Sequence, residues 1–229
     1  MQKKEWFDEW FDSIYYHILY QHRDNEEAAS FIDRLIAYLD IHKGDKILDL
    51  ACGKGRHSIY LNKKGFDVTG VDLSSQNIEL AKRNENATLH FEEHDMRDVY
   101  MDTKEANLNV IKATVESLKT GGTLLIDFMN PYVVINHLVE AEEKVIENVK
   151  FTITREYTED EYLIKKIDIE DHGQHYHFFE KVKAIRRVEF LEYFERTNLR
   201  VVDVFGDYNL NPYQMDKSLR LIFLVEKQS

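Results

Sequence analysis

The residues best suited to chemistry are the glycines and the carboxylate of the segment from Asp49 to Gly55. This segment reads Asp-Leu-Ala-Cys-Gly-Lys-Gly and follows a short apolar run. Its glycines would let a ligand approach the backbone, and the N–H groups of a following helix start could bind that ligand. A carboxylate at Asp49 disfavours a pyrophosphate but suits the ammonium and sulfonium groups of S-adenosylmethionine (SAM). The segment therefore favours SAM as the cofactor.

A dinucleotide is the alternative ligand for such a loop. The cations of Lys54 and Arg56 would favour its phosphates. Against this, Ser58 stands where the dinucleotide fingerprint has its third glycine. A nucleotide-binding oxidoreductase is therefore a disfavoured hypothesis.

Further acids follow the next two predicted strands. Asp72 ends a strand predicted at 67–72, where a carboxylate can accept hydrogen bonds from both ribose hydroxyls. Asp95 and Met96 follow a strand predicted at 88–93, placed to meet the adenine amino group and to pack on its ring. Each acid alone could instead be a helix cap or a turn residue. Acids at three successive strand ends favour a ligand, because open parallel sheets bind ligands along that edge.

The elements that must position these residues alternate between strands and helices. Apolar runs predict the strands, while glycines and capping residues predict where helices begin and end. The expected strands are 46–51, 67–72, 88–93, 123–129, 199–207 and 219–227, and the expected helices are 56–64, 105–118 and 187–197. This alternation predicts an α/β fold with a Rossmann-like, doubly wound and mostly parallel sheet.

Two further regions accompany this core. Apolar residues at helical spacing predict one amphipathic helix over 5–20 and a second helix from Asp24, so residues 1–44 are expected to form a helical lid. Alternating runs between 145 and 185 predict an inserted antiparallel meander, which would shape a substrate pocket or a dimer contact. No linker separates independent domains, so 1–229 is expected to be a single domain.

Three segments resemble the first three motifs of class I SAM-dependent methyltransferases. They read ILDLACGKGRHSIYL, GFDVTGVDLS and HDMRD. The resemblance implies that the loop glycines and Asp49 lie at the methionine part of SAM, Asp72 on the ribose, and Asp95 with Met96 on the adenine. The cofactor-binding residues expected from these motifs are Asp49, Ala51, Cys52, Gly53, Gly55, Arg56, Asp72, Leu73, Asp95 and Met96. Within this set, Cys52 is expected to be a small packing residue rather than a nucleophile.

The likeness continues outside the motifs. The segment YHILYQHR, the insert and the segment FLEYFERTNLRVVDVFGD are similar to bacterial aminosugar N,N-dimethyltransferases and their relatives. In that family a Tyr and an Arg of the N-terminal segment hold the cofactor carboxylate, which implies Tyr20 and Arg23 here. The alternative is that both side chains only tie the first helix to its neighbour. The resemblance also makes nitrogen the expected methyl acceptor.

The chain departs from the family between Asp95 and Glu105. The family has a fourth strand and a loop there, whereas this chain has only MRDVYMDTK. That strand is central in the family, so its loss would open two rows of backbone donors and acceptors. We expect that about 10–20 residues, one strand plus a loop, are absent after 97–100, with any active-site residues they carry. Direct pairing of the strands at 46–51 and 123–129 would contradict this.

No residue is predicted firmly as a catalyst, because methyl transfer from a sulfonium mainly requires a positioned nucleophile and the exclusion of water. His22, beside the expected carboxylate clamp, is a weak candidate base. His175 and His177 would share one strand face, but without a third ligand we expect a surface and no metal site. Asn130-Pro131-Tyr132 resembles the Asn-Pro-Pro-Tyr of amino methyltransferases, yet it lacks one proline and lies on another strand, so we expect a turn.

Composition limits the partners. A net charge of -12 repels phosphate backbones, so the expected substrate is a small molecule and not a nucleic acid. No stretch approaches the roughly 20 apolar residues that span a bilayer, and the single Cys52 cannot form an internal disulfide, so no membrane partner and a cytoplasmic location are expected. A homodimer is left open. The expected function is SAM-dependent methylation of a small molecule, and the alternative is a non-catalytic module that binds SAM or S-adenosylhomocysteine.

Overall fold

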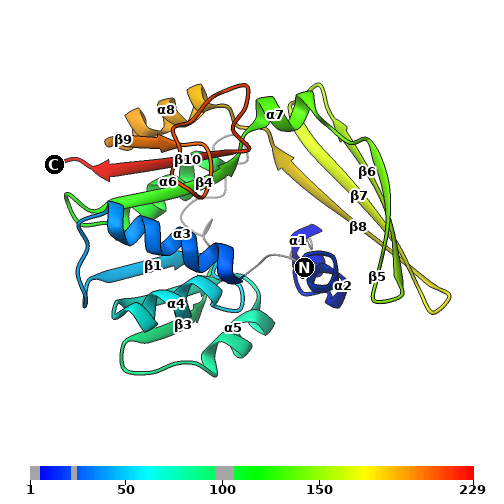
Figure 1. Cartoon of the computed structure of the whole chain (residues 1–229), viewed down its shortest axis with the longest axis horizontal. Helices are drawn as coiled ribbons and strands as arrows, with labels where there is room; N and C mark the ends of the chain where they lie inside the picture. The colour runs from blue at the N-terminus through cyan, green and yellow to red at the C-terminus, as the bar shows by residue number, and fades with distance from the viewer. Residues whose placement is uncertain (1–5, 22–24, 96–105) are drawn as a thin grey trace.

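The computed structural model describes residues 6–21, 25–95 and 106–229 of the chain. Figure 1 shows a core of strands and helices on one side, a long antiparallel sheet on the other, and two short helices between them. In the described part of the chain, no helix has both the length and the apolar character needed to cross a membrane.

One half of the core is a three-stranded parallel sheet with the order β1-β2-β3. Its elements in chain order are β1 (Lys46–Leu50), α4 (Arg56–Lys64), β2 (Asp67–Asp72), α5 (Ser75–Lys82) and β3 (Leu89–Glu93). Leu50 at the end of β1 pairs with Val71 near the end of β2. Because parallel strands with this register end together, the loops that follow β1 and β2 start side by side.

The other half of the core has the strand order β4-β10-β9, with β10 antiparallel to both neighbours. Its elements are α6 (Ala106–Ser117), β4 (Thr123–Met129), α8 (Arg187–Arg196), β9 (Leu199–Phe205) and β10 (Arg220–Lys227). Alternate side chains of β10 are buried on opposite faces of the sheet. Phe223 packs with residues of α6 and α8, while Leu224 packs with Phe31 of helix α3 (Asn25–Tyr38).

Helix α3 joins the two halves of the core. Its Leu35 packs on the half that contains β4, whereas its neighbour Ile36 packs on the half that contains β1. The two sheets, with helices packed against them, confirm the predicted α/β class.

Strands β1 and β4 show where the core is divided. Within the described residues, β1 pairs only with β2, and β4 pairs only with β10. Leu48 of β1 is 42% exposed, although strands in such sheets are usually covered on both faces. The direct pairing that would contradict an absent strand is therefore not observed in the described ranges, and the absence of that strand stays a prediction.

The inserted sheet is a meander with the order β5-β6-β7-β8. Its strands are β5 (Ala141–Ile146), β6 (Val149–Tyr157), β7 (Tyr162–Asp171) and β8 (Gln174–Lys183). It starts before the expected residue 145 and has one strand more than the three alternating runs suggested. The extra strand β5 reads AEEKVI and is mostly exposed, so it lacks the apolar alternation that predicts a strand.

The N-terminal helices α1 (Trp6–Trp10) and α2 (Ile14–Leu19) replace the single helix expected over 5–20. The amphipathic segment is divided into two helices because the side chain of Ser13 accepts a hydrogen bond from the backbone N–H of Tyr15 (3.1 Å) and caps α2. Buried side chains of both helices pack on the meander, namely Trp10, Tyr15 and Leu19 against Val149, Phe151, Ile153, Ile167 and Ile169. The expected helix start at Asp24 lies outside the described residues.

Candidate active site

The loop after β1 has the backbone shape expected of a ligand-binding glycine loop. Ala51, Gly53 and Gly55 all have positive φ angles, of 59°, 56° and 80°. A Cβ atom added to Gly55 would lie 2.6 Å from the ring of Phe91, so this glycine is required by the protein's own packing. A Cβ atom added to Gly53 would meet nothing within 4 Å. Gly53 therefore borders open space that a bound molecule can fill.

Asp49 supplies the carboxylate at the end of β1. Its Oδ2 accepts a hydrogen bond from the hydroxyl of Ser58 (2.6 Å) at the start of α4. Desolvation by the surrounding protein raises the pKa of Asp49 above its ordinary value, because it disfavours the charged form. A cationic ligand group would offset that effect, so this position suits the ammonium or sulfonium of SAM.

Asp72 is held between the two loops that start side by side. Its Oδ2 accepts a hydrogen bond from the backbone N–H of Gly53 (2.8 Å), and its Oδ1 accepts one from the N–H of Ser74 (2.9 Å). Each carboxylate oxygen has a further lone-pair direction. The carboxylate is thus oriented by the backbone while it can still accept hydrogen bonds from two ribose hydroxyls.

The remaining expected cofactor residues lie around these carboxylates. Burial, followed by the charges of Asp49 and Asp72, raises the pKa of Cys52 to about 12, so the thiol stays protonated and acts as a packing residue. Leu73 directly follows Asp72 and is 39% exposed, which leaves an apolar surface for a ring to pack on. Arg56 is exposed, with Nη2 3.2 Å from Nε2 of His57. Asp95 is half-buried after β3, and Met96 lies outside the described residues.

The N-terminal helices reach this site through contacts that the sequence did not predict. Asp12, between α1 and α2, accepts a hydrogen bond from the hydroxyl of Ser74, which also caps α5. Burial, followed by the charge of Lys54 in the glycine loop, lowers the pKa of His17 in α2. The two helices therefore cover the edge of the sheet where the glycine loop and Asp72 lie. Nothing in the periodicity of residues 5–20 distinguishes Asp12 from an ordinary surface acid.

The same helices are fastened to the meander by a polar cluster. The indole N–H of Trp10 and the hydroxyl of Tyr20 both donate to Oε1 of Glu180, at 2.8 and 2.6 Å. Lys165 donates to the hydroxyl of Tyr20 (2.6 Å), and burial lowers the pKa of its ammonium. The structure thus places Tyr20, expected to hold the cofactor carboxylate, in contact with the meander. Arg23 and His22 lie outside the described residues.

Asn130 is a structural cap. It is fully buried, its side chain caps helix α7 (Pro131–Asn136), and its Nδ2 donates to the carbonyl oxygens of Met215 (2.8 Å) and Ser218 (2.7 Å). Its Oδ1 accepts from the hydroxyl of Tyr213 (3.2 Å). Both ends of the amide are therefore used within the protein. The segment begins a short helix rather than a simple turn, as the proline at the first helical position would have indicated.

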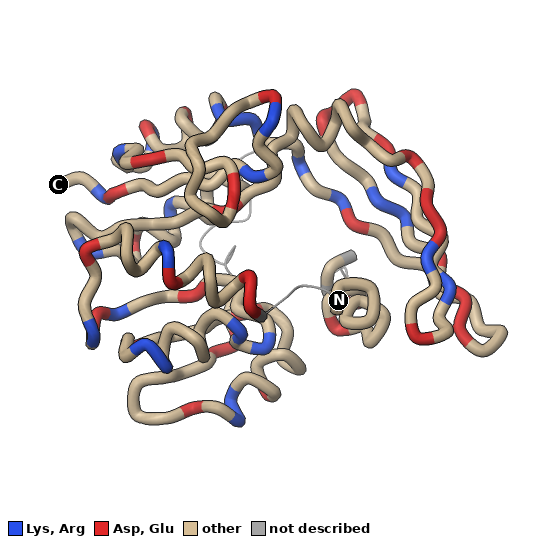
Figure 2. The backbone as a smooth tube through the Cα atoms, viewed as in Figure 1, with Lys and Arg blue, Asp and Glu red and all other residues tan. Residues whose placement is uncertain are grey.

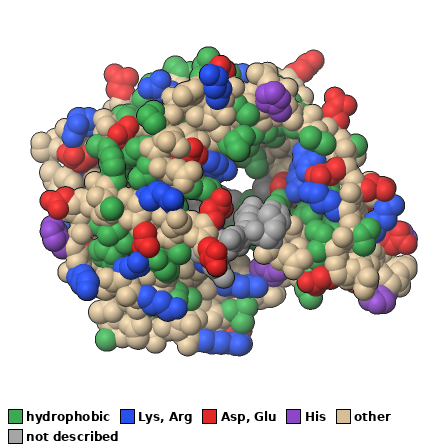
Figure 3. All heavy atoms as spheres, in the orientation of Figure 1, with side chains coloured by type: hydrophobic (Ala, Val, Ile, Leu, Met, Phe, Trp, Pro, Cys, Tyr) green, Lys and Arg blue, Asp and Glu red, His purple; other side chains and the backbone are tan. Residues whose placement is uncertain are grey.

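The two histidines of the insert lie on the outer side of the meander. His177 contacts Asp168 through Nδ1, and a shallow hollow there also includes His175 and Lys150. In the residues that the structure describes, no three His, Cys, Asp or Glu side chains are arranged to hold a metal ion. Figure 3 shows a different hollow in the surface, between the core and the meander.

Sequence comparison agrees with the geometry of the glycine loop. Residues 47–122 match the family model described as a methyltransferase domain. YqeM of Bacillus subtilis (strain 168), which is named as a candidate methyltransferase, is 34% identical over 102 residues. That alignment covers 36% of this chain, and it spans 41% of the length of this curated relative.

Two solved structures are similar over nearly the whole chain. An S-adenosylmethionine-dependent methyltransferase from Clostridium acetobutylicum ATCC 824 has a TM-score of 0.76 at 19% identity, covering 94% of this chain and 97% of that one. The sugar N-methyltransferase KedS8 from Streptoalloteichus sp ATCC 53650 has a TM-score of 0.71 at 18% identity, covering 100% and 97%. Residues 47–122 therefore match a methyltransferase domain, and the chain as a whole shares the fold of these two solved structures.

Proposed function

We propose that this protein transfers the methyl group of SAM to a nitrogen atom of a small molecule. The observation that carries the proposal is the joint anchoring of the glycine loop and Asp72, with the N-terminal helices covering both through Asp12 and Ser74. When bound, SAM supplies an electrophilic methyl group. The chain's part is then to orient the reactants and to exclude water, which suffices for an amine acceptor.

Each expected residue has a separate task in this proposal. Asp49 pairs with the ammonium or sulfonium of the cofactor, Asp72 binds the ribose, and Asp95 binds the adenine amino group. Arg23 remains a proposed contact of the cofactor carboxylate, and Tyr20 would join it by exchanging the hydrogen bond that its hydroxyl donates to Glu180. No step requires a protein nucleophile, which agrees with the raised pKa of Cys52.

A small acceptor fits both the shape and the charge of the protein. Figure 3 shows a hollow between core and meander, and such a hollow suits a molecule that is enclosed during reaction. In Figure 2, Lys and Arg are interspersed with Asp and Glu along the core and the meander. With a net charge of -12, such a surface disfavours nucleic acid. The name of KedS8, a sugar N-methyltransferase, supports nitrogen as the acceptor atom. The cytoplasm, where SAM is made, is the proposed location.

Calorimetric titration with S-adenosylhomocysteine tests the cofactor site, with Asp72→Asn as the site variant. Asp67→Asn is the matched control, because Asp67 begins the same strand and lies about as far from the loop as β2 allows. We expect micromolar binding to the wild type and to Asp67→Asn, and binding at least about tenfold weaker to Asp72→Asn. Absence of binding to the wild type would refute the proposal. Mass spectrometry of a pool of amines incubated with SAM then tests nitrogen methylation.

A non-catalytic module that binds SAM or S-adenosylhomocysteine is the second candidate. The division of the core between β1 and β4 favours it, because cofactor residues lie on only one of the two halves. Formation of S-adenosylhomocysteine from SAM in the presence of metabolite pools separates the two. Binding without turnover, across pools that contain primary, secondary and aromatic amines, would support the module.

A further inference from the structure

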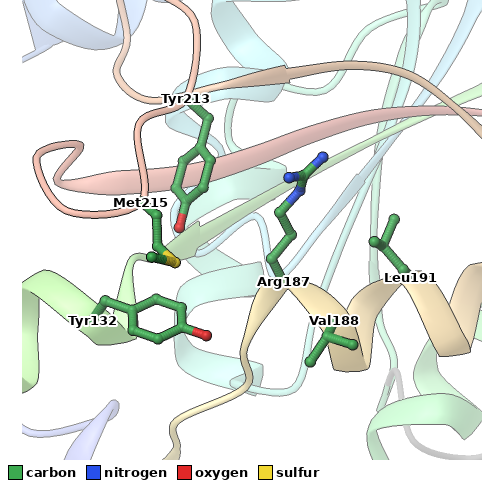
Figure 4. A pocket seen from close by; sticks show the side chains of 6 residues that line it. All are labelled: Tyr132, Arg187, Val188, Leu191, Tyr213 and Met215. Carbon is green, nitrogen blue, oxygen red and sulfur yellow. The ribbon is translucent and has the colours of Figure 1, made fainter.

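A second site is formed at the carboxyl end of β4, away from the glycine loop. A pocket of about 220 Å³ is lined there by Tyr132, Arg187, Val188, Leu191, Tyr213 and Met215 (Figure 4). Its residues come from α7, from α8 and from the loop before β10. In Figure 1, β1 and β4 both run toward the side of the core that faces the meander, and β4 ends at α7, so the pocket and the glycine loop lie at the same edge of the core.

The pocket has a fixed framework. The fully buried Asn130 holds its walls together, since it accepts from the hydroxyl of Tyr213 and donates to the carbonyl of Met215. The same side chain accepts from the N–H of Tyr132 (3.3 Å), and so fixes the start of α7. Two segments of the chain, the start of α7 and the loop before β10, are thus tied to one buried amide.

The lining is apolar apart from the tyrosine hydroxyls and one guanidinium. Val188, Leu191 and Met215 are 56%, 38% and 54% exposed, so they give this pocket an apolar surface that a ligand can cover. Figure 4 shows Tyr132 and Tyr213 on either side of Met215, with the Arg187 side chain extending from the start of α8 between them and Leu191. The lining therefore suits a ligand with a flat apolar body.

Arg187 gives this surface a positive charge. The neighbouring Arg186 contacts Glu161, and Arg220 lies 2.7 Å from Asp127, whereas no carboxylate within the described ranges pairs with Arg187. The nearest acid on the same helix turn, Glu189, instead accepts the backbone N–H of Arg186 (2.8 Å). Burial, followed by the charge of Tyr132, raises the pKa of Tyr213 and the charge of Arg187 opposes it, so the hydroxyl of Tyr213 stays protonated.

We propose that this pocket binds a planar organic carboxylate, with the carboxylate on Arg187 and the ring between the tyrosines and the aliphatic side chains. A guanidinium fork matches a carboxylate, and its plane can also stack on an aromatic ring. The volume is below the roughly 300–1,000 Å³ of sites for drug-sized ligands, so it holds one ring rather than a nucleoside. This pocket is then the subsite for the anionic end of the methyl acceptor, an assignment that rests on the proposed function.

Benzoate is the probe for this site, with benzamide as its neutral counterpart and inorganic phosphate as an anion without a ring. Ligand-observed NMR titrations of the full chain should give a millimolar dissociation constant for benzoate, and at least tenfold weaker binding of the other two. Arg187→Gln should weaken benzoate at least tenfold. Arg200→Gln is the matched control, because Arg200 is exposed on β9 and pairs with Glu226 (2.9 Å).

The outcomes separate this proposal from the proposed function. Benzoate binding that is unchanged in Arg187→Gln, or equal binding of benzamide, would overturn the pocket assignment. If Arg187→Gln does not fold, Leu191→Trp fills the pocket from an exposed position and should abolish benzoate binding with the fold retained. Calorimetry with S-adenosylhomocysteine on the same proteins reports the cofactor site alone, and Arg187→Gln should bind it like the wild type.

Discussion

Substitution of Gly53 and of Gly55 by alanine should separate cofactor binding from stability. Both glycines have positive φ angles, of 56° and 80°, which costs an alanine about 1–2 kcal/mol. The added methyl group at Gly55 would lie 2.6 Å from Phe91, which is itself 1% exposed and cannot easily move. Overpacking of this kind adds about 1–3 kcal/mol. At Gly53 no protein atom lies within 4 Å of the added methyl group, so no such addition is expected.

The expected free energy of unfolding therefore falls by about 2–5 kcal/mol in Gly55→Ala and by about 1–2 kcal/mol in Gly53→Ala. Cofactor binding should follow the opposite order among the folded proteins. If the space beside Gly53 holds the cofactor, Gly53→Ala should bind S-adenosylhomocysteine at least tenfold more weakly, about 1.4 kcal/mol. Ala51, which already has a φ angle of 59° in the same loop, shows that alanine is tolerated in this conformation.

Urea unfolding followed by circular dichroism measures the first quantity, and calorimetric titration measures the second. Equal losses of stability in the two variants would refute the role assigned to Phe91. Wild-type affinity in Gly53→Ala would refute the position of the cofactor beside Gly53, even if the titration of the wild type shows micromolar binding.

Three further predictions test the surrounding structure. Glu180→Ala removes the acceptor shared by Trp10 and Tyr20 and leaves Lys165 without its carboxylate. The free energy of unfolding, measured by urea unfolding, should therefore fall by about 1–3 kcal/mol. The control Glu170→Ala, on the outer side of the meander, should change it little. Arg155 holds the pKa of Glu142 below its ordinary value in the folded protein. The pair therefore stabilises the fold fully at pH values above the ordinary glutamate pKa, and this stabilisation is lost as the pH falls through the lower pKa of the folded state. Thermal melts of the wild type and Glu142→Gln should therefore differ near neutral pH and converge in acid; a constant difference would contradict the pairing. Burial raises the pKa of Cys52 from 9.0 to about 12. At pH 8 the folded protein should therefore have about a thousandfold less thiolate than a free thiol of pKa 9.0. Iodoacetamide, which reacts with the thiolate, should modify Cys52 rapidly only after unfolding.

The parts of the fold that the sequence predicted are those with strong local patterns. The helix Arg56–Lys64 is bounded by Gly55 and Gly65, both of which have positive φ angles, and its predicted and observed limits agree. The strand Thr123–Met129 is a mostly apolar run, interrupted by Asp127, between a glycine pair and Asn130, and its limits also agree. In these segments the hydrophobic period and the end signals are consistent with each other, so local information is sufficient.

Other features depend on contacts that no local pattern contains. Ser13 lies within an otherwise regular helical spacing of apolar residues, and only its hydrogen bond as the cap of α2 shows that this segment forms two helices. Asp12 meets Ser74 across 62 positions of sequence, and Trp10 meets Glu180 across 170. Such pairs follow from the packing of the N-terminal helices between core and meander. The glycine loop and Asp72 could be predicted because they follow adjacent strands, whereas the covering contacts could not.

The division of the core decides which measurements are independent. The predicted cofactor residues Asp49, Gly53 and Asp72 lie in β1, in the loop after β1 and in β2. The pocket around Arg187 belongs to the half of the core with β4, β9 and β10. Helix α3 packs on both halves, but among the described residues no strand pairing joins β1 to β4. Binding of S-adenosylhomocysteine therefore tests one half, and binding of benzoate tests the other. Methyl transfer requires SAM and the acceptor to be held at a fixed distance, so only turnover tests whether α3 and the N-terminal helices keep the halves in register. Binding of SAM without turnover across the amine pools would identify the chain as a binding module.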